Sequence, residues 1–320
     1  MTRTHRLLGA LALLAGAAAA TAQPYPSRAV RVVVPFAAAG GTDILARALS
    51  QKMSEALGQP FVVENRAGGN SIIATETVAK AAPDGYTLLF TTNIFTITPS
   101  LYRKLSYSAE TDFTPITMAG SAPSLLAVHP SVPVRSVREL IALAKSRPGS
   151  LTMSAPGVGT PSHLSAEFFK QTTGIDVLIV QYKGTGAALS DLVGGQVAMS
   201  FGSLPGLAPL TRAGRLHAIA VTSATRSPAL PEVAAIAETF PDFEVVIWYG
   251  LFAPARTPRE ALARLHAEAV RALGNNDVRQ RLAAEGFDAG GTTPEEFAAL
   301  VRRDMARWQK VIAKANIQVE

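Results

Sequence analysis

The segment from residue 30 to residue 58 constrains the fold most, because it predicts a strand, a loop and a helix in succession. Residues 30–34 form a valine-rich run, which is typical of a strand buried on both faces. Pro35 ends the run, because proline cannot donate to a sheet ladder. The next residues have the apolar spacing of one helix face, and Gly58 is placed to end that helix. That face consists of Leu45, Leu49, Met53 and Ala56.

The loop of residues 36–41 reads Phe-Ala-Ala-Ala-Gly-Gly, so few side chains shield its backbone N–H groups. We expect Thr42 or Asp43 to cap the helix that follows. Exposed N–H groups at the positive end of a helix dipole form an anion site. We therefore interpret the loop as a grip for a carboxylate. The alternative is a purely structural junction, and the spacing does not match the G-x-G-x-x-G motif of dinucleotide-binding proteins.

The N-terminal residues predict a cleaved signal peptide covering residues 1–22. Arg3 and Arg6 precede an apolar run over residues 7–20, and Ala-Thr-Ala at residues 20–22 is a cleavage pattern. The alternative is a membrane anchor, which we disfavour because the run is short and no second long apolar segment follows. We expect export, with the mature chain beginning at Gln23.

Composition narrows the class of protein. The chain has no cysteine, which excludes disulfides, thiolate metal sites, cysteine nucleophiles and lipid attachment through cysteine. The formal charge of +6 becomes +4 without the two leader arginines, and the cations are scattered, so a nucleic-acid surface is not indicated. The 298 residues after the predicted leader suffice for two domains. We expect a location in the periplasm of a Gram-negative bacterium.

Strands and helices alternate beyond the first helix, which predicts a parallel α/β sheet. We expect strands over residues 61–64 and 86–90, with a loop at 66–71 between them. Ligands of such sheets lie at the carboxyl ends of the strands. The 36–41 loop and residues 91–93 should therefore share one rim. Asn93 can be read equally as a ligand contact or as a turn residue.

The strand–loop–helix pattern occurs twice more. A small-residue loop at 155–159 follows a strand at 151–154, and Thr160-Pro161 fits a helix N-cap followed by proline. A third loop at 183–186 precedes a helix at 187–193. His163 lies in the first turn after the second loop. It can orient that loop, contact a ligand carboxylate or pack, and we favour support of the loop.

No enzyme signature is found in the sequence. It contains no G-x-S-x-G, H-E-x-x-H or P-loop motif. The mature histidines are far apart and lack metal-ligand spacing, so we expect no catalytic residue, metal or cofactor. They are His129, His163, His217 and His266. Two α/β lobes that close on a small anion match the hinge design of periplasmic binding proteins.

Several specific motifs resemble the Bug family, extracytoplasmic solute-binding proteins of tripartite tricarboxylate transporters. They are VVVPFAAAGGTDILAR, GQPFVVENRAGG, AKAAPDGYTLLF, SLYRKLSY, LTMSAPGVGTPSHL, YKGTGAALSDLVGGQV and WYGLFAPARTP. The resemblance implies a two-lobed Venus-flytrap fold of type II-like architecture, with a carboxylated ligand between the lobes. We expect domain 1 at residues 25–122 and 248–320, domain 2 at 123–247, and hinge strands near Leu125 and Val245.

The resemblance also implies which residues bind the ligand. From the first loop these are Phe36, Ala38, Gly40, Gly41, Thr42 and Asp43. From the second loop and its helix they are Ser154, Gly157, Gly159, Thr160 and His163. The remaining residues are Thr92, Asn93, Lys183, Gly184, Thr185, Ser203, Trp248 and Tyr249.

One departure from the family bears on the ligand. Gly202-Ser203 stands where many relatives have Asp-Asn, and the missing carboxylate would leave a buried ammonium without a partner. This predicts a ligand that has carboxylates and lacks a free amino group, although neutral variation is the alternative.

The expected function is capture of a small carboxylate for a tripartite tricarboxylate-type transporter. We expect a monomer whose partners are that transporter's membrane subunits, and no contact with nucleic acid. The second hypothesis is a sensor that presents the ligand to a signalling partner. An enzyme is the third, disfavoured by the lack of a nucleophile and a base.

Overall fold

The computed structural model describes residues 25–38, 40–317 and 319. The predicted signal peptide, residues 1–22, lies outside the described residues. The strands are β1 (Val30–Val34), β2 (Phe61–Asn65), β3 (Thr87–Thr92), β4 (Phe113–Val128), β5 (Thr152–Ala155), β6 (Leu178–Gln181), β7 (Met199–Ser203), β8 (His217–Val221), β9 (Val246–Pro254) and β10 (Asp288–Ala289). The helices are α2 (Gly41–Leu57), α3 (Ile72–Ala79), α4 (Ile94–Leu101), α5 (Val137–Ser146), α6 (Pro161–Thr173), α7 (Thr185–Val193), α8 (Leu204–Arg212), α9 (Arg259–Gly274), α10 (Asn276–Ala284) and α11 (Pro294–Lys314), with 3-10 turns η1 (Gly69–Ser71) and η2 (Ile236–Glu238).

The strands form one continuous sheet in the order β2-β1-β3-β9-β4-β7-β5-β6, with β8 and β10 both pairing β4. Its two ends are parallel, as predicted: β2 and β3 flank β1, and β6 and β7 flank β5. The centre of the sheet is antiparallel, because β9 runs antiparallel to both β3 and β4, and β4 antiparallel to β7. The reason is that β4 and β9 carry the chain between the two ends in opposite directions.

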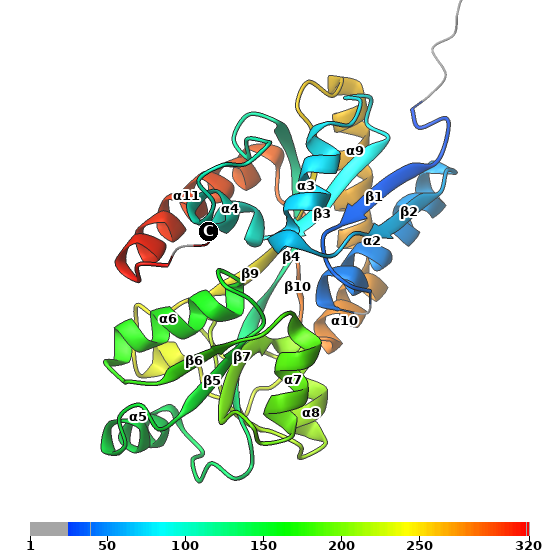
Figure 1. Cartoon of the computed structure of the whole chain (residues 1–320). Helices are drawn as coiled ribbons and strands as arrows, with labels where there is room; N and C mark the ends of the chain where they lie inside the picture. The colour runs from blue at the N-terminus through cyan, green and yellow to red at the C-terminus, as the bar shows by residue number, and fades with distance from the viewer. Residues whose placement is uncertain (1–24, 39, 318, 320) are drawn as a thin grey trace, which may run out of the picture.

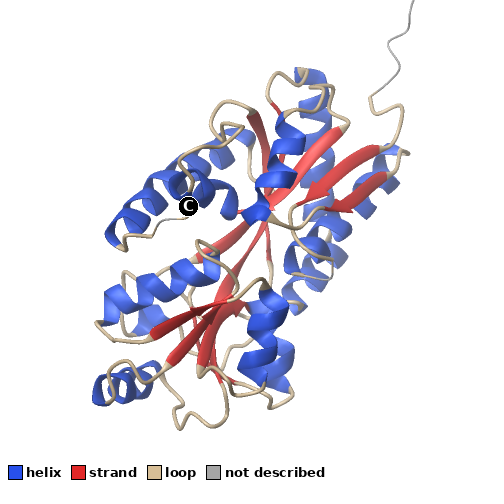
Figure 2. Ribbon diagram, in the orientation of Figure 1, coloured by secondary structure: helices blue, strands red, loops and turns tan. Residues whose placement is uncertain are grey.

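The molecule has two lobes joined by β4 and β9, which confirms the predicted two-lobed α/β fold (Figures 1 and 2). The first lobe holds β1–β3 with α2, α3, α9 and α10, and the second holds β5–β8 with α5–α8. Along β4 the pairing changes lobes between Pro123, opposite β9, and Ser124, opposite β7. This change lies beside the predicted hinge, and the domain bounds at residues 122 and 247 stay a prediction.

Each lobe has its own hydrophobic core. In the first lobe, valines of β1 and the apolar face of α2 pack against β9, α9 and α10. In the second lobe, Phe169 of α6 packs edge-on against Phe201 of β7, with ring centroids 5.6 Å apart. Within the described residues no helix has both the length and the apolar character to cross a bilayer.

Helices α4 and α11 lie side by side at the junction of the lobes (Figure 1). The N-terminal half of α11 places Phe297 and Val301 in a cluster with first-lobe residues. Its C-terminal half places Trp308 and Ile312 in the core of the second lobe. The last helix therefore packs on both lobes.

Gly58 ends α2 as predicted, and hydroxyl side chains cap the starts of two other helices. Gly58 is in the left-handed conformation, with φ 68°, at the end of α2. The Ser136 hydroxyl accepts from the Glu139 N–H at the start of α5, and that of Thr293 accepts from the Glu296 N–H at the start of α11. Local capping chemistry thus fixes where these helices begin and end.

Candidate functional site

The first loop leads into α2, whose first backbone N–H groups have no described acceptor. Gly40 is the N-cap of α2, with φ −83° and ψ 167°, so the prediction that Thr42 or Asp43 caps the helix is wrong. The helix begins two to three residues earlier than predicted, because glycine adopts the N-cap conformation readily even without a side-chain cap. Among the described residues, none accepts a hydrogen bond from the N–H of Gly41 or Thr42. These donors are available to an anion.

Asp43 instead belongs to a network that fixes the loop. Its carboxylate accepts from Arg47 Nε at 2.9 Å and from Asn65 Nδ2 at 2.9 Å. The same Asn65 amide nitrogen donates to the carbonyl oxygen of Phe36 at 3.0 Å. Asp43 is only 3% exposed, and the neighbouring guanidinium compensates its charge. The network ties the end of β2 to both ends of the loop, so Asp43 positions the donors.

Tyr249 places a phenol beside those donors. A Cβ added at Gly41 would lie 3.4 Å from the Tyr249 hydroxyl and 3.4 Å from the Phe287 ring. The two rings pack edge to face, with centroids 5.3 Å apart. Burial raises the pKa of Tyr249, so the phenol stays protonated at neutral pH and can donate to an anion.

Trp248, the neighbouring predicted site residue, faces the other side of the sheet. Its indole nitrogen donates to Asp304 Oδ2 of α11 at 2.9 Å, and the Thr96 hydroxyl donates to the same oxygen at 2.6 Å. Burial raises the pKa of Asp304 above its usual range. Trp248 therefore secures the junction of β9 with α4 and α11, whereas Tyr249 lies at the start of α2.

In the second loop, nearby side chains form hydrogen bonds with the loop's own backbone groups. The Thr160 hydroxyl donates to the Gly157 carbonyl at 2.8 Å and accepts from the His163 N–H at 3.3 Å. The Gly159 N–H donates to His163 Nδ1 at 2.9 Å. Burial lowers the pKa of His163 to about 4, so the ring is neutral and carries its proton on Nε2. His163 thus holds the loop in shape.

Buried polar groups without a protein partner lie next to these loops. Both amide atoms of Asn93 and the hydroxyl of Ser154 are buried, and no described residue bonds them. A buried amide left unpaired is costly, so Asn93 favours a bound molecule that offers both a donor and an acceptor. This supports a ligand contact over a turn role for Asn93.

The other predicted residues lie around the same strand ends. Lys183, Gly184 and Thr185 are exposed, and the Gly184 N–H donates to the Pro156 carbonyl at 3.0 Å, which joins the third loop to the second. In the sheet, Thr92 pairs with Tyr249, and Ser203 pairs with Ser124 of β4. Ala38 is exposed at the first loop.

Gly202 does not face these residues. A Cβ added at Gly202 would lie 2.8 Å from Leu207 Cδ1, so a side chain at this position would point into α8. The absence of an aspartate at position 202 therefore gives little support to the prediction that the ligand lacks an amino group.

Asn70 is a contact that the sequence did not single out. Its amide nitrogen donates to the Tyr102 hydroxyl at 2.9 Å and to the Val158 carbonyl of the second lobe at 2.9 Å. Residues 66–71 read as an ordinary loop, and no periodicity marks Asn70. The one local hint was the turn-forming run Gly68-Gly69-Asn70-Ser71, since asparagine adopts left-handed backbone conformations more readily than most residues.

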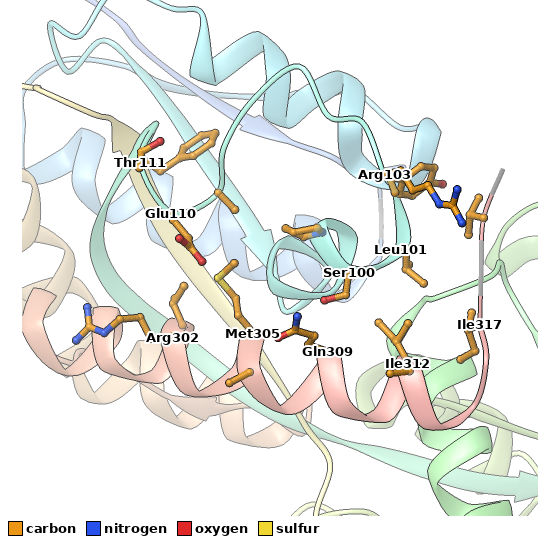
Figure 3. Close-up of a pocket in the computed structure, with 18 of the residues that line it drawn as sticks. Ser100, Leu101, Arg103, Glu110, Thr111, Arg302, Met305, Gln309, Ile312 and Ile317 are labelled. Carbon is orange, nitrogen blue, oxygen red and sulfur yellow. The ribbon is translucent and has the colours of Figure 1, made fainter.

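A cavity of about 1700 Å³ lies elsewhere, between α11 and the segment that links α4 to β4 (Figure 3). None of the predicted ligand residues lines it. Its walls include Arg103, Glu110, Arg302, Met305 and Gln309. Across the described parts of the chain, no group of three or more His, Asp or Glu side chains is arranged to hold a metal ion.

Comparisons with known proteins agree with this geometry. A family model described as "Tripartite tricarboxylate transporter family receptor" matches residues 45–317. Protein BugT of Bordetella pertussis is 34% identical over 100% of this chain and 99% of its own length. An R. palustris protein solved with adipate is 38% identical, with a TM-score of 0.87 over 92% of this chain and 100% of its own. MatC from Rhodopseudomonas palustris with bound malate is 35% identical, with a TM-score of 0.82 over 90% and 100% of the two chains.

Proposed function

Because this chain belongs to the tripartite tricarboxylate transporter receptor family, we propose that it is a periplasmic binding protein that captures a small carboxylate and delivers it to a transporter of that type. The observation that carries the proposal is the start of α2. There, the backbone N–H groups of Gly41 and Thr42 have no described protein acceptor, and the Tyr249 hydroxyl lies close to Gly41.

A carboxylate at this position would be held by dipoles. The N–H groups of Gly41 and Thr42 point along the positive end of a 17-residue helix, and the Tyr249 phenol adds a neutral donor. No cation is needed for such binding, since hydrogen bonds to a charged acceptor are about twice as strong as neutral ones. The Arg47–Asp43–Asn65 network keeps the donors in place before the ligand arrives.

The second lobe supplies different chemistry for the other end of the ligand. In the second lobe, Ser154 offers a buried hydroxyl, and the exposed Lys183 places a positive charge beside the second loop. Asn93, which follows β3 of the first lobe, adds a buried amide. Two separated sets of contacts suit a molecule with polar groups at both ends. Adipate and malate, which are bound to two similar proteins, are both dicarboxylates.

A thermal-shift panel tests the proposal directly. Purified protein is melted with adipate, malate, a monocarboxylate of each length, aspartate, glutamate and their amides. A ligand at 100 times its Kd stabilises the folded state by about 2.7 kcal/mol, which gives a clear rise in Tm. We expect dicarboxylates to produce the rise. No rise with any carboxylate, confirmed by calorimetry, would contradict the proposal.

The same panel addresses the amino group and catalysis. A rise with aspartate or glutamate alone would show that the ligand carries an ammonium, contrary to the expectation from Gly202-Ser203. Recovery of the bound acid unchanged after prolonged incubation is expected of a receptor and not of an enzyme. Delivery is tested by uptake of the identified acid in cells with and without this chain.

A further inference from the structure

A polar side chain of the β2–α3 loop links the two lobes. The Asn70 amide nitrogen lies 2.9 Å from the Val158 carbonyl oxygen, which belongs to the second loop. The same nitrogen lies 2.9 Å from the Tyr102 hydroxyl at the end of α4. Thr98 of α4 donates in turn to the Asn70 carbonyl at 3.3 Å. One amide therefore joins the first lobe, the junction helix α4 and the second lobe.

The backbone at this point is strained. Asn70 has φ 48° and Ser71 has φ 66°, two consecutive non-glycine residues in the left-handed region. Asparagine tolerates this region, but serine adopts it at a cost, and such strain persists only where the surroundings enforce it. The conformation is what aims the Asn70 side chain across the junction.

The surface that receives Asn70 fits it closely. A Cβ added at Gly157 would lie 3.7 Å from the Asn70 side-chain oxygen, and a Cβ added at Gly159 would overlap Leu101 Cδ1. Leu101 belongs to the core cluster that continues into the second lobe. Small residues on both sides of Val158 thus let the first lobe and α4 approach the second loop.

We propose that the arrangement of the lobes in this structure is the closed, ligand-holding one, and that Asn70 is a positioning residue that clasps the lobes in it. It acts on the second loop through the Val158 carbonyl and touches no ligand. The clasp consists of Asn70, Tyr102 and Val158. Because all three groups belong to the protein, the clasp lowers the free energy of the closed state whether or not a ligand is bound. Its effect on affinity rests on the function proposed above, whereas its effect on closure does not.

The size of the effect follows from the bond. An intramolecular hydrogen bond contributes about 1 kcal/mol net, which is roughly a fivefold change in an equilibrium constant. Loss of the clasp should therefore shift the open–closed equilibrium of the ligand-free protein about fivefold toward the open form. Where ligand binds only the closed form, a fall in the closed fraction lowers the apparent affinity by the same factor.

The decisive variant is Asn70→Asp, studied without ligand. Aspartate has the same shape and tolerates the same backbone conformation, but it cannot donate to Val158 and places a charge against that carbonyl. We expect a larger radius of gyration by small-angle X-ray scattering and about fivefold faster amide exchange at Val158 and Gly159. The far-ultraviolet circular dichroism should match that of the natural chain.

Three further variants separate the clasp from general effects. Asn70→Gly removes the side chain but keeps the left-handed backbone, and should open the protein to a similar extent. Tyr102→Phe removes one partner and leaves the Val158 bond, so its effect should be smaller. Asn316→Asp makes the same change at a second left-handed asparagine, which is exposed and has φ 51°, and should leave scattering and exchange unchanged.

The proposal is wrong if Asn70→Asp and Asn70→Gly both fold and both keep the scattering and exchange of the natural chain. Should Asn70→Asp fail to fold, Asn70→Gly alone decides. Because scattering and exchange use no ligand, this outcome is distinct from a failure of the thermal-shift panel. If the panel succeeds, the dissociation rate of the active acid should rise about fivefold in Asn70→Gly.

Discussion

The first and second loops have the same strand–loop–helix pattern but differ in whether their backbone groups have hydrogen-bond partners. Each connects a buried strand to a helix through small residues. In the first, the helix begins on Gly40, and no described residue accepts from the Gly41 or Thr42 N–H. In the second, Thr160 and His163 take up the loop's own hydrogen bonds. Glycine content therefore does not mark a binding loop; what matters is whether side chains already occupy the donors.

The difference predicts different roles for the two loops. A helix start with unpaired N–H groups can bind an anion. The second loop, whose backbone groups already have partners, instead presents a fixed carbonyl at Val158. We expect changes to the first loop to reduce binding, and changes to the second to reduce stability first. Four experiments test this division.

The largest expected effect is loss of binding in Gly41→Pro. Gly41 is the first residue of α2, where proline is well tolerated, and the extended Gly40 before it suits a pre-proline position. The change removes one N–H donor to a charged acceptor, so affinity for the most strongly shifting acid should fall about 10- to 100-fold. Calorimetry measures this. Gly41→Ala keeps the donor and is the control; equal affinity in Gly41→Pro would show that the loop does not bind.

The second effect concerns stability. His163→Ala leaves the buried Gly159 N–H without its acceptor and opens a small cavity, which should lower the free energy of unfolding by about 2–3 kcal/mol. Urea titration measures the loss. His163→Asn, whose side-chain oxygen can take the place of Nδ1, should recover most of it. If His163→Ala reduced affinity strongly without changing stability, His163 would be a ligand contact.

The third effect is a pH dependence of stability. The folded pKa of His163 is about 4 and the unfolded pKa is about 6.5, so between these values the unfolded state binds more protons. Stability should therefore be full above pH 6.5 and fall with decreasing pH, by about 2 kcal/mol at pH 5. Urea midpoints across this range give the slope. His163→Asn should flatten it, and an unchanged slope would assign the dependence to other groups.

The smallest effect lies in the support of the first loop. Asn65→Ala removes the bonds to Phe36 and Asp43, which should cost about 1 kcal/mol and lower affinity a few-fold through looser donors. Calorimetry and urea titration together separate the two losses. Gln51→Ala, a change at an exposed position of α2 outside this network, is the control. An affinity unchanged in Asn65→Ala would mean that the donors need no such support.

Sequence patterns predicted the parallel ends of the sheet, most helices and their caps, because these depend on local periodicity and turn chemistry. They missed α4, since its β-branched residues and Pro99 do not resemble a helix and its stability comes from packing against α11. They also cut β4 short, because Pro115 and Pro123 interrupt the pattern of a strand. The Asn70–Val158 bond joins residues 88 positions apart, so no local pattern could indicate it. The open first loop was predictable from its composition, whereas the occupied donors of the second depended on tertiary placement of His163.

The double packing of α11 has a consequence for how the protein acquires its structure. Trp308 and Ile312, near the end of the chain, complete a core whose other members begin at Ile97. Contacts so distant in sequence form late, because the intervening chain must first be closed into a loop. The second lobe cannot finish folding until the final helix has been synthesised, and a nascent chain lacking it would expose Phe169 and Phe243. Removal of the residues from Arg307 onward, which takes away Trp308 and Ile312, should therefore unfold the second lobe. Because α11 packs on both lobes, we expect the two lobes to unfold cooperatively.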